Sequence, residues 1–243
     1  MKSLDTDFFA RQSASAGTPP CNLDALADNV FARRRLKRSA CKNLNAIFDE
    51  SSFTKHFPSD STVLLHGEPA QAIYRIVSGT VRCCTIDAEG GRQIFSFVKK
   101  GEYLGISDID RWHFTAESVD HVIVQVIPRM VVEQALAVNV ALREELRALV
   151  RNLLVRREQQ LLSLVSMRAP ERLLGFLCDF AESRSSSDIV VLPMCRRDIG
   201  DHLGMTTETT SRAFGTLKQR GAIVMTTPEK YRLVSAAGQP GRS

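Results

Sequence analysis

Residues 196–221 read RRDIGDHLGMTTETTSRAFGTLKQRG, and this stretch has the pattern of a helix-turn-helix. It predicts a short helix over 197–203, a tight turn at Gly204, and a second helix over 207–220 with Thr206 as its N-cap. Glycine suits the positive φ that such a turn requires. The apolar positions expected to form the small core of this unit are Ile199, Leu203, Met205, Ala213, Leu217 and Ile223.

The first turn of the second predicted helix is polar on its outward side, where we expect Thr207, Glu208, Ser211 and Arg212. A recognition helix enters the major groove of DNA with its N-terminal residues against the base edges. A carboxylate such as Glu208 can accept from a cytosine amino group, and Arg212 can donate two hydrogen bonds to guanine. Their spacing of four residues also predicts that Glu208 orients Arg212. The alternative is a solvated helix face with an incidental ion pair, which the turn glycine, the cap and the flanking strands disfavour.

Lysines and arginines beyond this face are candidates for phosphate contacts, which add affinity and salt dependence but no sequence information. We assign Lys218, Arg220 and Lys230 to this role. The chain carries a formal charge of +5 and a pI near 9.0, which is only mildly basic. Its Arg and Lys residues gather at 33–42, 143–157 and 196–220, however, and a local basic face suits a polyanion partner.

Upstream, residues 53–127 consist of short runs rich in Val, Ile, Thr and aromatic residues, separated by turn residues. Their spacing predicts a β-sandwich or jelly roll. Ser78-Gly79-Thr80 and Glu89-Gly90-Gly91 are expected to be hairpin turns.

Residues 140–167 contain no Gly or Pro and predict one long helix of about 40 Å. Leucines recur along it in steps of four, three and four, which is a heptad seam: Leu142, Leu146, Leu149 and Leu153. An ordinary amphipathic connector is the alternative. We favour a dimerisation helix, because it is longer than a small domain needs for its own core.

At 243 residues, with 44% hydrophobic and 24% charged residues, the chain has room for two modest domains. No apolar run approaches the length of a membrane span, and no signal peptide pattern opens the chain, so we expect a cytoplasmic protein without membrane contact. The six cysteines should be reduced thiols; none forms a C-x-x-C pair and no metal site is visible. No Ser-His-Asp order or phosphate-cradling loop favours an enzyme.

Cys195 stands directly before the first helix of the helix-turn-helix and is followed by two arginines. Nearby cations and a helix N-terminus both stabilise a thiolate. Oxidation to sulfinate or sulfonate would put negative charge beside DNA phosphates, so we predict that Cys195 is redox-sensitive. The alternative is a small apolar side chain tucked under the wing.

The run Glu208-Thr209-Thr210-Ser211-Arg212 resembles the E-x-x-S-R recognition motif of the CRP/FNR transcription regulators, and the FixK-like branch is most similar. The resemblance covers residues 47–235 and implies an α+β fold: an N-terminal β-roll (jelly roll) sensor-like domain, a long dimerisation helix and a C-terminal winged helix-turn-helix. We therefore divide the chain into a mobile N-terminal tail and helix (1–46), the β-roll (47–135), the dimerisation helix (136–168), the winged helix-turn-helix (169–235) and a tail (236–243). It further implies a homodimeric activator of microaerobic genes that binds palindromic TTGAT-like half-sites on double-stranded DNA and recruits RNA polymerase.

The chain departs from the effector sites of this family. Cyclic nucleotide binders carry a G-E-L turn and an Arg-Ser pair, whereas this chain has Gly105-Ile106-Ser107 and Phe114-Thr115-Ala116. Cys21 and Cys41 are too far apart for the iron-sulfur motif, and Gln125 aligns with its last ligand. We thus expect no cofactor. The alternative is a ligand-gated regulator whose β-roll binds an unidentified small molecule or haem, with His56, His66, His113 and His121 as candidate haem ligands.

Overall fold

The computed structural model describes residues 41–106, 110–181 and 189–234. The predicted tails before residue 41 and after residue 235 lie outside these ranges, as does Cys21. Within the described ranges, none of the helices combines the length and apolar character that crossing a bilayer demands.

Two four-stranded antiparallel sheets form the β-roll, with strand orders β1-β8-β3-β6 and β2-β7-β4-β5. The buried side chains between them include Ile76, Val81, Val98, Trp112 and Val124. The predicted jelly roll is therefore confirmed. Its strands are β1 (Phe53–Phe57), β2 (Thr62–Leu64), β3 (Ala72–Ser78), β4 (Thr80–Ile86), β5 (Arg92–Lys99), β6 (Tyr103–Leu104), β7 (Thr115–Ser118) and β8 (Val122–Pro128).

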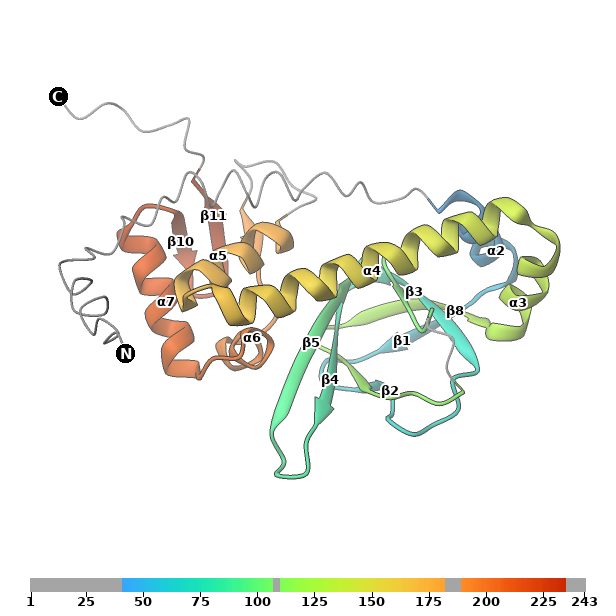
Figure 1. Ribbon diagram of the computed structural model, residues 1–243, viewed down its shortest axis with the longest axis horizontal. Helices are drawn as coiled ribbons and strands as arrows, with labels where there is room; N and C mark the ends of the chain where they lie inside the picture. The colour runs from blue at the N-terminus through green and yellow to red at the C-terminus, as the bar shows by residue number, and fades with distance from the viewer. Residues whose placement is uncertain (1–40, 107–109, 182–188, 235–243) are drawn as a thin grey trace, which may run out of the picture.

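One of the two predicted hairpin turns is wrong. Residues 89–91 lie in the turn of the β4–β5 hairpin, which projects from the β-roll in Figure 1. Strands β3 and β4, by contrast, belong to different sheets, so the chain crosses between sheets at Gly79. A turn signal of small residues marks a change of direction and does not say which strands pair afterwards.

Three helices cover one end of the β-roll: α2 (Lys42–Ser51), α3 (Arg129–Val138) and the 27-residue α4 (Val140–Ser166). Asn139 separates α3 from α4, and its side chain accepts a hydrogen bond of 3.0 Å from the backbone N–H of Leu142. The predicted domain limits after residues 46 and 135 therefore fall inside α2 and α3. Helices α2 and α3 share one apolar cluster with the first turns of α4.

The C-terminal unit packs three helices against a small antiparallel sheet of order β10-β11-β9. Helix α4 connects it to the β-roll end of the molecule (Figure 1). The predicted winged helix-turn-helix and the overall fold class are confirmed. Its elements are α5 (Ala169–Phe180), β9 (Val190–Val191), α6 (Arg196–Leu203), α7 (Thr207–Gln219), β10 (Ile223–Thr227) and β11 (Lys230–Leu233).

Candidate nucleic-acid interface

The turn between α6 and α7 is held by two glycines. Gly204 adopts φ 62°, the left-handed conformation expected for it. A Cβ on Gly200 would lie 2.6 Å from the backbone oxygen of Met205, so only glycine lets α6 approach the turn this closely. The backbone N–H of Met205 donates to the Gly200 carbonyl at 3.0 Å. This contact fixes the angle between the two helices.

Helix α7 begins where the sequence predicts. The Thr206 side chain accepts from the Thr209 backbone N–H at 3.2 Å, as an N-cap residue should. The hydroxyl of Thr210 is buried and donates to the Thr206 carbonyl at 2.9 Å. All six predicted core positions are buried except Met205, which is partly buried. Sequence reasoning missed Thr210 and Phe214, which the helical spacing 210, 213, 214, 217 could have shown.

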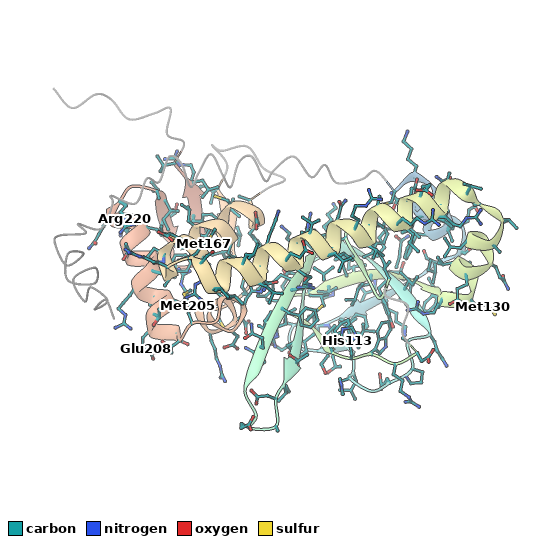
Figure 2. The ribbon with its side chains drawn as sticks, in the orientation of Figure 1. His113, Met130, Met167, Met205, Glu208 and Arg220 are labelled. Atoms are coloured by element: carbon teal, nitrogen blue, oxygen red, sulfur yellow. The ribbon has the colours of Figure 1, made fainter. Side chains whose placement is uncertain are left out.

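The outward face of α7 carries the predicted DNA-contacting side chains. Every predicted DNA-contacting side chain is exposed: Thr207, Glu208, Ser211, Arg212 and Lys218. Figure 2 shows Glu208 near one end of the helix and Arg220 just past the other, both at the outer edge of the molecule. Among the residues that the structure describes, this face of α7 is therefore open to solvent.

Glu208 is prepared to act as an acceptor. Hydrogen bonds from its own backbone N–H and from the Thr206 hydroxyl lower the pKa of its carboxyl, so it stays ionised at neutral pH. The expected orientation of Arg212 by Glu208 is not what the structure shows. Arg212 donates to the Thr209 hydroxyl at 3.4 Å, and these two described charges form no ion pair. Both side chains are exposed to solvent, so their hydrogen-bonding groups can pair with DNA bases instead of with each other.

The two arginines after Cys195 have different surroundings. Arg196 donates to the Pro228 carbonyl at 2.6 Å and its guanidinium lies over the Phe214 ring, so it joins α6 and α7 to the turn of the wing. Burial lowers the pKa of Arg196 to about 10. Arg197 is exposed. Cys195 is itself exposed and is the N-cap residue of α6, which excludes the alternative of a cysteine tucked under the wing.

The wing is anchored to α5 by Tyr231, which is fully buried and donates from its hydroxyl to the Leu177 carbonyl at 2.6 Å. Strand β11 thereby presents its alternate residues Lys230 and Arg232 to solvent. Lys218 and Arg220, at the C-terminal end of α7, are exposed as well.

The predicted dimerisation seam needs correction. Leu142 is fully buried inside its own chain, in the cluster with α2 and α3, and Leu146 and Leu149 pack against that cluster. Only Leu153 of the four is exposed, at 43%. Several further apolar residues of α4 face solvent, Val140 and Leu162 among them. Four of the exposed residues follow one another in steps of four and seven, and we call them the α4 stripe: Val150, Leu154, Leu161 and Val165. At its start, Leu136, Leu146, Val150 and Leu154 line an open groove of about 570 Å³ with the stems of Arg143, Arg147 and Arg151.

Of the four candidate haem histidines, only His56 and His121 lie close together, with ring centroids 5.8 Å apart. His56, His66, His113 and His121 are all exposed. In the part of the chain that the structure describes, no three His, Cys, Asp or Glu side chains gather as metal ligands. Ile106 and Ala116, from the two segments that depart from the cyclic nucleotide motifs, are buried apolar residues.

Two domain families match the chain in agreement with this architecture. A cyclic nucleotide-binding domain matches residues 54–139, and a Crp-like helix-turn-helix domain matches residues 171–237. A nitrogen fixation regulation protein, FixK of Azorhizobium caulinodans, is 32% identical over 182 residues, covering 73% of each chain. The chain belongs to the CRP/FNR family. Within that family it belongs to the FixK-like branch.

Two further relatives agree with this placement. FixK of Bradyrhizobium diazoefficiens is 29% identical over 195 residues, which is 77% of this chain and 82% of the relative. The solved structure of FixK2 from Bradyrhizobium japonicum superposes with a TM-score of 0.73 at 29% identity and covers 76% of this chain and 94% of that one. The chain is therefore a transcription regulator with a helix-turn-helix DNA-binding domain, and its relatives are regulators rather than enzymes.

Proposed function

We propose that this regulator binds palindromic DNA as a homodimer and reads each half-site with the N-terminal turn of α7. The observation that carries the proposal is the exposed, polar, ionised face formed by Thr207, Glu208, Ser211 and Arg212 on a helix whose inner face is fully packed. The buried hydroxyl of Thr210 and the close approach at Gly200 fix the axis of α7. The exposed face is therefore held in one orientation, as base recognition requires.

The chemistry of this face favours a G·C pair. Arg212 can donate two hydrogen bonds to guanine, and Glu208 can accept from the amino group of the paired or neighbouring cytosine. A TTGAT-like half-site contains such a pair. Lys218, Arg220 and Lys230 would contact phosphates on either side and fix the register of α7 in the groove.

The α4 stripe is the surface that we assign to the partner copy. Leu154 is 59% exposed, Leu161 64% and Val165 90%, and a soluble helix seldom presents such a row to water. Steps of four and seven along the helix would bring the stripe to the axis of a parallel helix pair. Such a two-fold dimer would place two α7 helices on half-sites with centres about 10 base pairs apart.

Relatives suggest the regulated genes. They include proteins described as nitrogen fixation regulation and anaerobic regulatory proteins. We propose by analogy an activator of microaerobic or anaerobic genes that recruits RNA polymerase in the cytoplasm.

A redox response is part of this proposal. The exposed thiol of Cys195 lies at the N-terminus of α6, the helix that crosses the DNA backbone in this motif. An oxidised, negatively charged side chain there would repel phosphates. Of the two arginines that follow Cys195, only Arg197 is exposed, and Arg196 is engaged with the wing.

One observation favours a second candidate, a regulator gated by a small ligand. A cavity of about 650 Å³ lies between β5, α4 and the DNA-binding domain, with Phe95, Phe97, Tyr103, Phe176 and Leu149 among its lining residues. Arg157 also lines it, with its guanidinium 4.6 Å from the centroid of the Phe95 ring. Titration of candidate ligands during DNA binding separates the two candidates, since only the gated regulator changes its affinity.

The decisive experiment is selection of bound DNA from a random pool with the purified, reduced protein. We expect a two-fold site that contains a G·C pair in each half. A pool that keeps no common two-fold site after repeated rounds would contradict the proposed function.

A further inference from the structure

Ion pairs between side chains link the DNA-binding domain to the β-roll, in addition to the covalent connection through α4. The β4–β5 hairpin lies against α6, and Arg92 at the start of β5 reaches the α6 carboxylate of Asp201. The Arg92 Nε lies 2.9 Å and its Nη2 2.7 Å from the same Asp201 oxygen. Next to this pair, Gln93 donates to the Asp201 backbone carbonyl at 2.6 Å. The hairpin thus holds both the side chain and the backbone of one α6 residue.

A second carboxylate of α6 is shared by two β-roll arginines. Asp198 lies in the first turn of α6, and only 5% of its side chain is exposed. One of its oxygens accepts from Arg92, and the other accepts from Arg82 of β4 at 3.2 Å. Arg82 is held in turn by Glu117 at 2.8 Å and by Asp60 at 3.1 Å. We call the contacts of Arg82 and Arg92 with Asp198 and Asp201 the interdomain clasp.

The clasp cannot be a chance surface contact. A buried carboxylate is strongly destabilising unless its charge is paired, and here two guanidiniums from another domain supply the pairing. Burial disfavours the charged form of Arg92, but hydrogen bonds and attraction from Asp201 and Asp198 outweigh it and raise the pKa of Arg92. Separation of the domains would leave Asp198 without these partners, so the clasp favours one interdomain arrangement.

That arrangement matters because the covalent connection alone does not fix it. Helix α4 ends at Ser166, and both Met167 and Arg168 have extended backbone before α5 begins. Such a break can absorb a rotation of the DNA-binding domain about the end of α4. In the clasped arrangement the outward face of α7 stays exposed, so the clasp is compatible with DNA binding.

We propose that Arg92 and Arg82 are positioning residues for DNA recognition. From the β-roll they hold Asp198 and Asp201, and they thereby fix the orientation of α7 relative to α4. In a dimer joined through α4, this orientation sets the distance and angle between the two reading helices. The clasp also neutralises Asp198, a carboxylate that would otherwise repel phosphates near the N-terminus of α6. The inference rests on the proposed dimeric binding of two half-sites.

The test uses full-length reduced protein and three DNA probes: the two-fold site selected by the wild type, the same site with a lengthened spacer, and one isolated half-site. Arg92→Gln and Asp201→Asn should each bind the two-fold site about tenfold more weakly. Both variants should bind the half-site as the wild type does and should discriminate less against the lengthened spacer. The double variant should lose no more than Arg92→Gln alone, because both changes remove one shared contact.

Arg75→Gln is the matched control. Arg75 is a partly buried arginine of the β-roll that donates to Gln125 and Asn45 and pairs with Asp49. None of these partners belongs to α6. Arg75→Gln should leave binding to all three probes unchanged. Thermal unfolding of each variant identifies any general loss of structure. Asp201→Asn is a nearly isosteric change of a partly exposed side chain and provides a second, independent removal of the same contact.

Two results would overturn the positioning role: equal losses on the two-fold site and the half-site, or binding of the two-fold site that is unchanged or tighter than that of the wild type. A wild type that selects no two-fold site would instead refute the proposed function, and this inference with it.

Discussion

Replacement of Leu154 tests whether the α4 stripe joins two copies of the chain. Leu154 is 59% exposed, near the middle of the stripe and beside the open groove at Val150. On the two-fold axis of a helix pair, each copy of Leu154 would be covered by the other helix. The change therefore counts twice in every dimer.

The size of the effect follows from this exposure. Complete burial of a leucine side chain contributes about 1.5–3 kcal/mol, and somewhat more than half of the Leu154 surface remains to be buried. Leu154→Ala should thus weaken the dimer by roughly 2 kcal/mol, or about 30-fold in the dissociation constant. Leu154→Glu should weaken it further, because two carboxylates would face each other at the axis.

Sedimentation equilibrium measures the dissociation constant, and binding to a palindrome against a half-site shows the consequence for DNA. Leu142→Ala provides the contrast, since Leu142 is buried in its own chain and its truncation should lower the free energy of unfolding by about 2–5 kcal/mol. Ile86→Ala, at an exposed apolar residue in β4, should change neither property. A Leu154→Glu protein that dimerises like the wild type would refute the assignment of the α4 stripe.

Three further predictions concern the DNA-binding domain. Arg212→Ala should lose about 1–3 kcal/mol of binding free energy at one base pair per half-site, whereas Lys218→Ala should weaken binding to all sequences alike. Competition binding at fixed salt measures both effects. Equal losses of affinity for specific and random DNA in both variants would disprove the assignment. Burial lowers the pKa of His202 from 6.5 to about 4, so stability present above pH 6.5 should decline as pH falls through this range, by about 2 kcal/mol at pH 5. Urea unfolding should show this acid loss reduced in His202→Gln, and an identical pH dependence in both proteins would contradict it. Peroxide should weaken DNA binding by the wild type but not by Cys195→Ser, and equal loss in both, with the cysteine peptides analysed by mass, would remove the redox role from Cys195.

The helix-turn-helix could be predicted nearly to the residue because its signals are local. Gly204 is required by the φ of the turn and Thr206 by the unsatisfied backbone N–H groups of α7, and each effect acts within four residues. The exposed face of α7 follows from the same periodicity. The same periodicity also predicts that Thr210 and Phe214 lie on the inner face of α7. Thr210 was missed because its side chain is polar, and Phe214 because the pattern was analysed mainly for DNA contacts.

The dimerisation seam shows where such reasoning fails. A leucine repeat indicates that one face of a helix is buried, but not by what. In α4 the first part of that face packs against α2 and α3, and Glu145 extends this contact by accepting backbone N–H bonds from Asn43 and Leu44 at 3.0 and 3.1 Å. The net effect is a lowered pKa for Glu145: burial alone would raise the pKa, but the hydrogen bonds lower it by more. No local pattern shows a cap that comes from a hundred residues away.

The first turn of α6 explains why the interdomain clasp is invisible in the sequence. Successive residues of a helix point about 100° apart, so three consecutive charged residues can serve three partners. Arg196 turns toward the wing, Arg197 is exposed to solvent, and Asp198 turns toward the β-roll. In the sequence, these residues form one charged run that suggests a single basic contact with DNA. In the structure they have three roles: Arg196 holds the helix-turn-helix to the wing, Arg197 is free to offer charge to DNA, and Asp198 fixes the orientation of the domain. Only the role of Asp198 requires a negative charge, because its partners are the arginines of the β-roll.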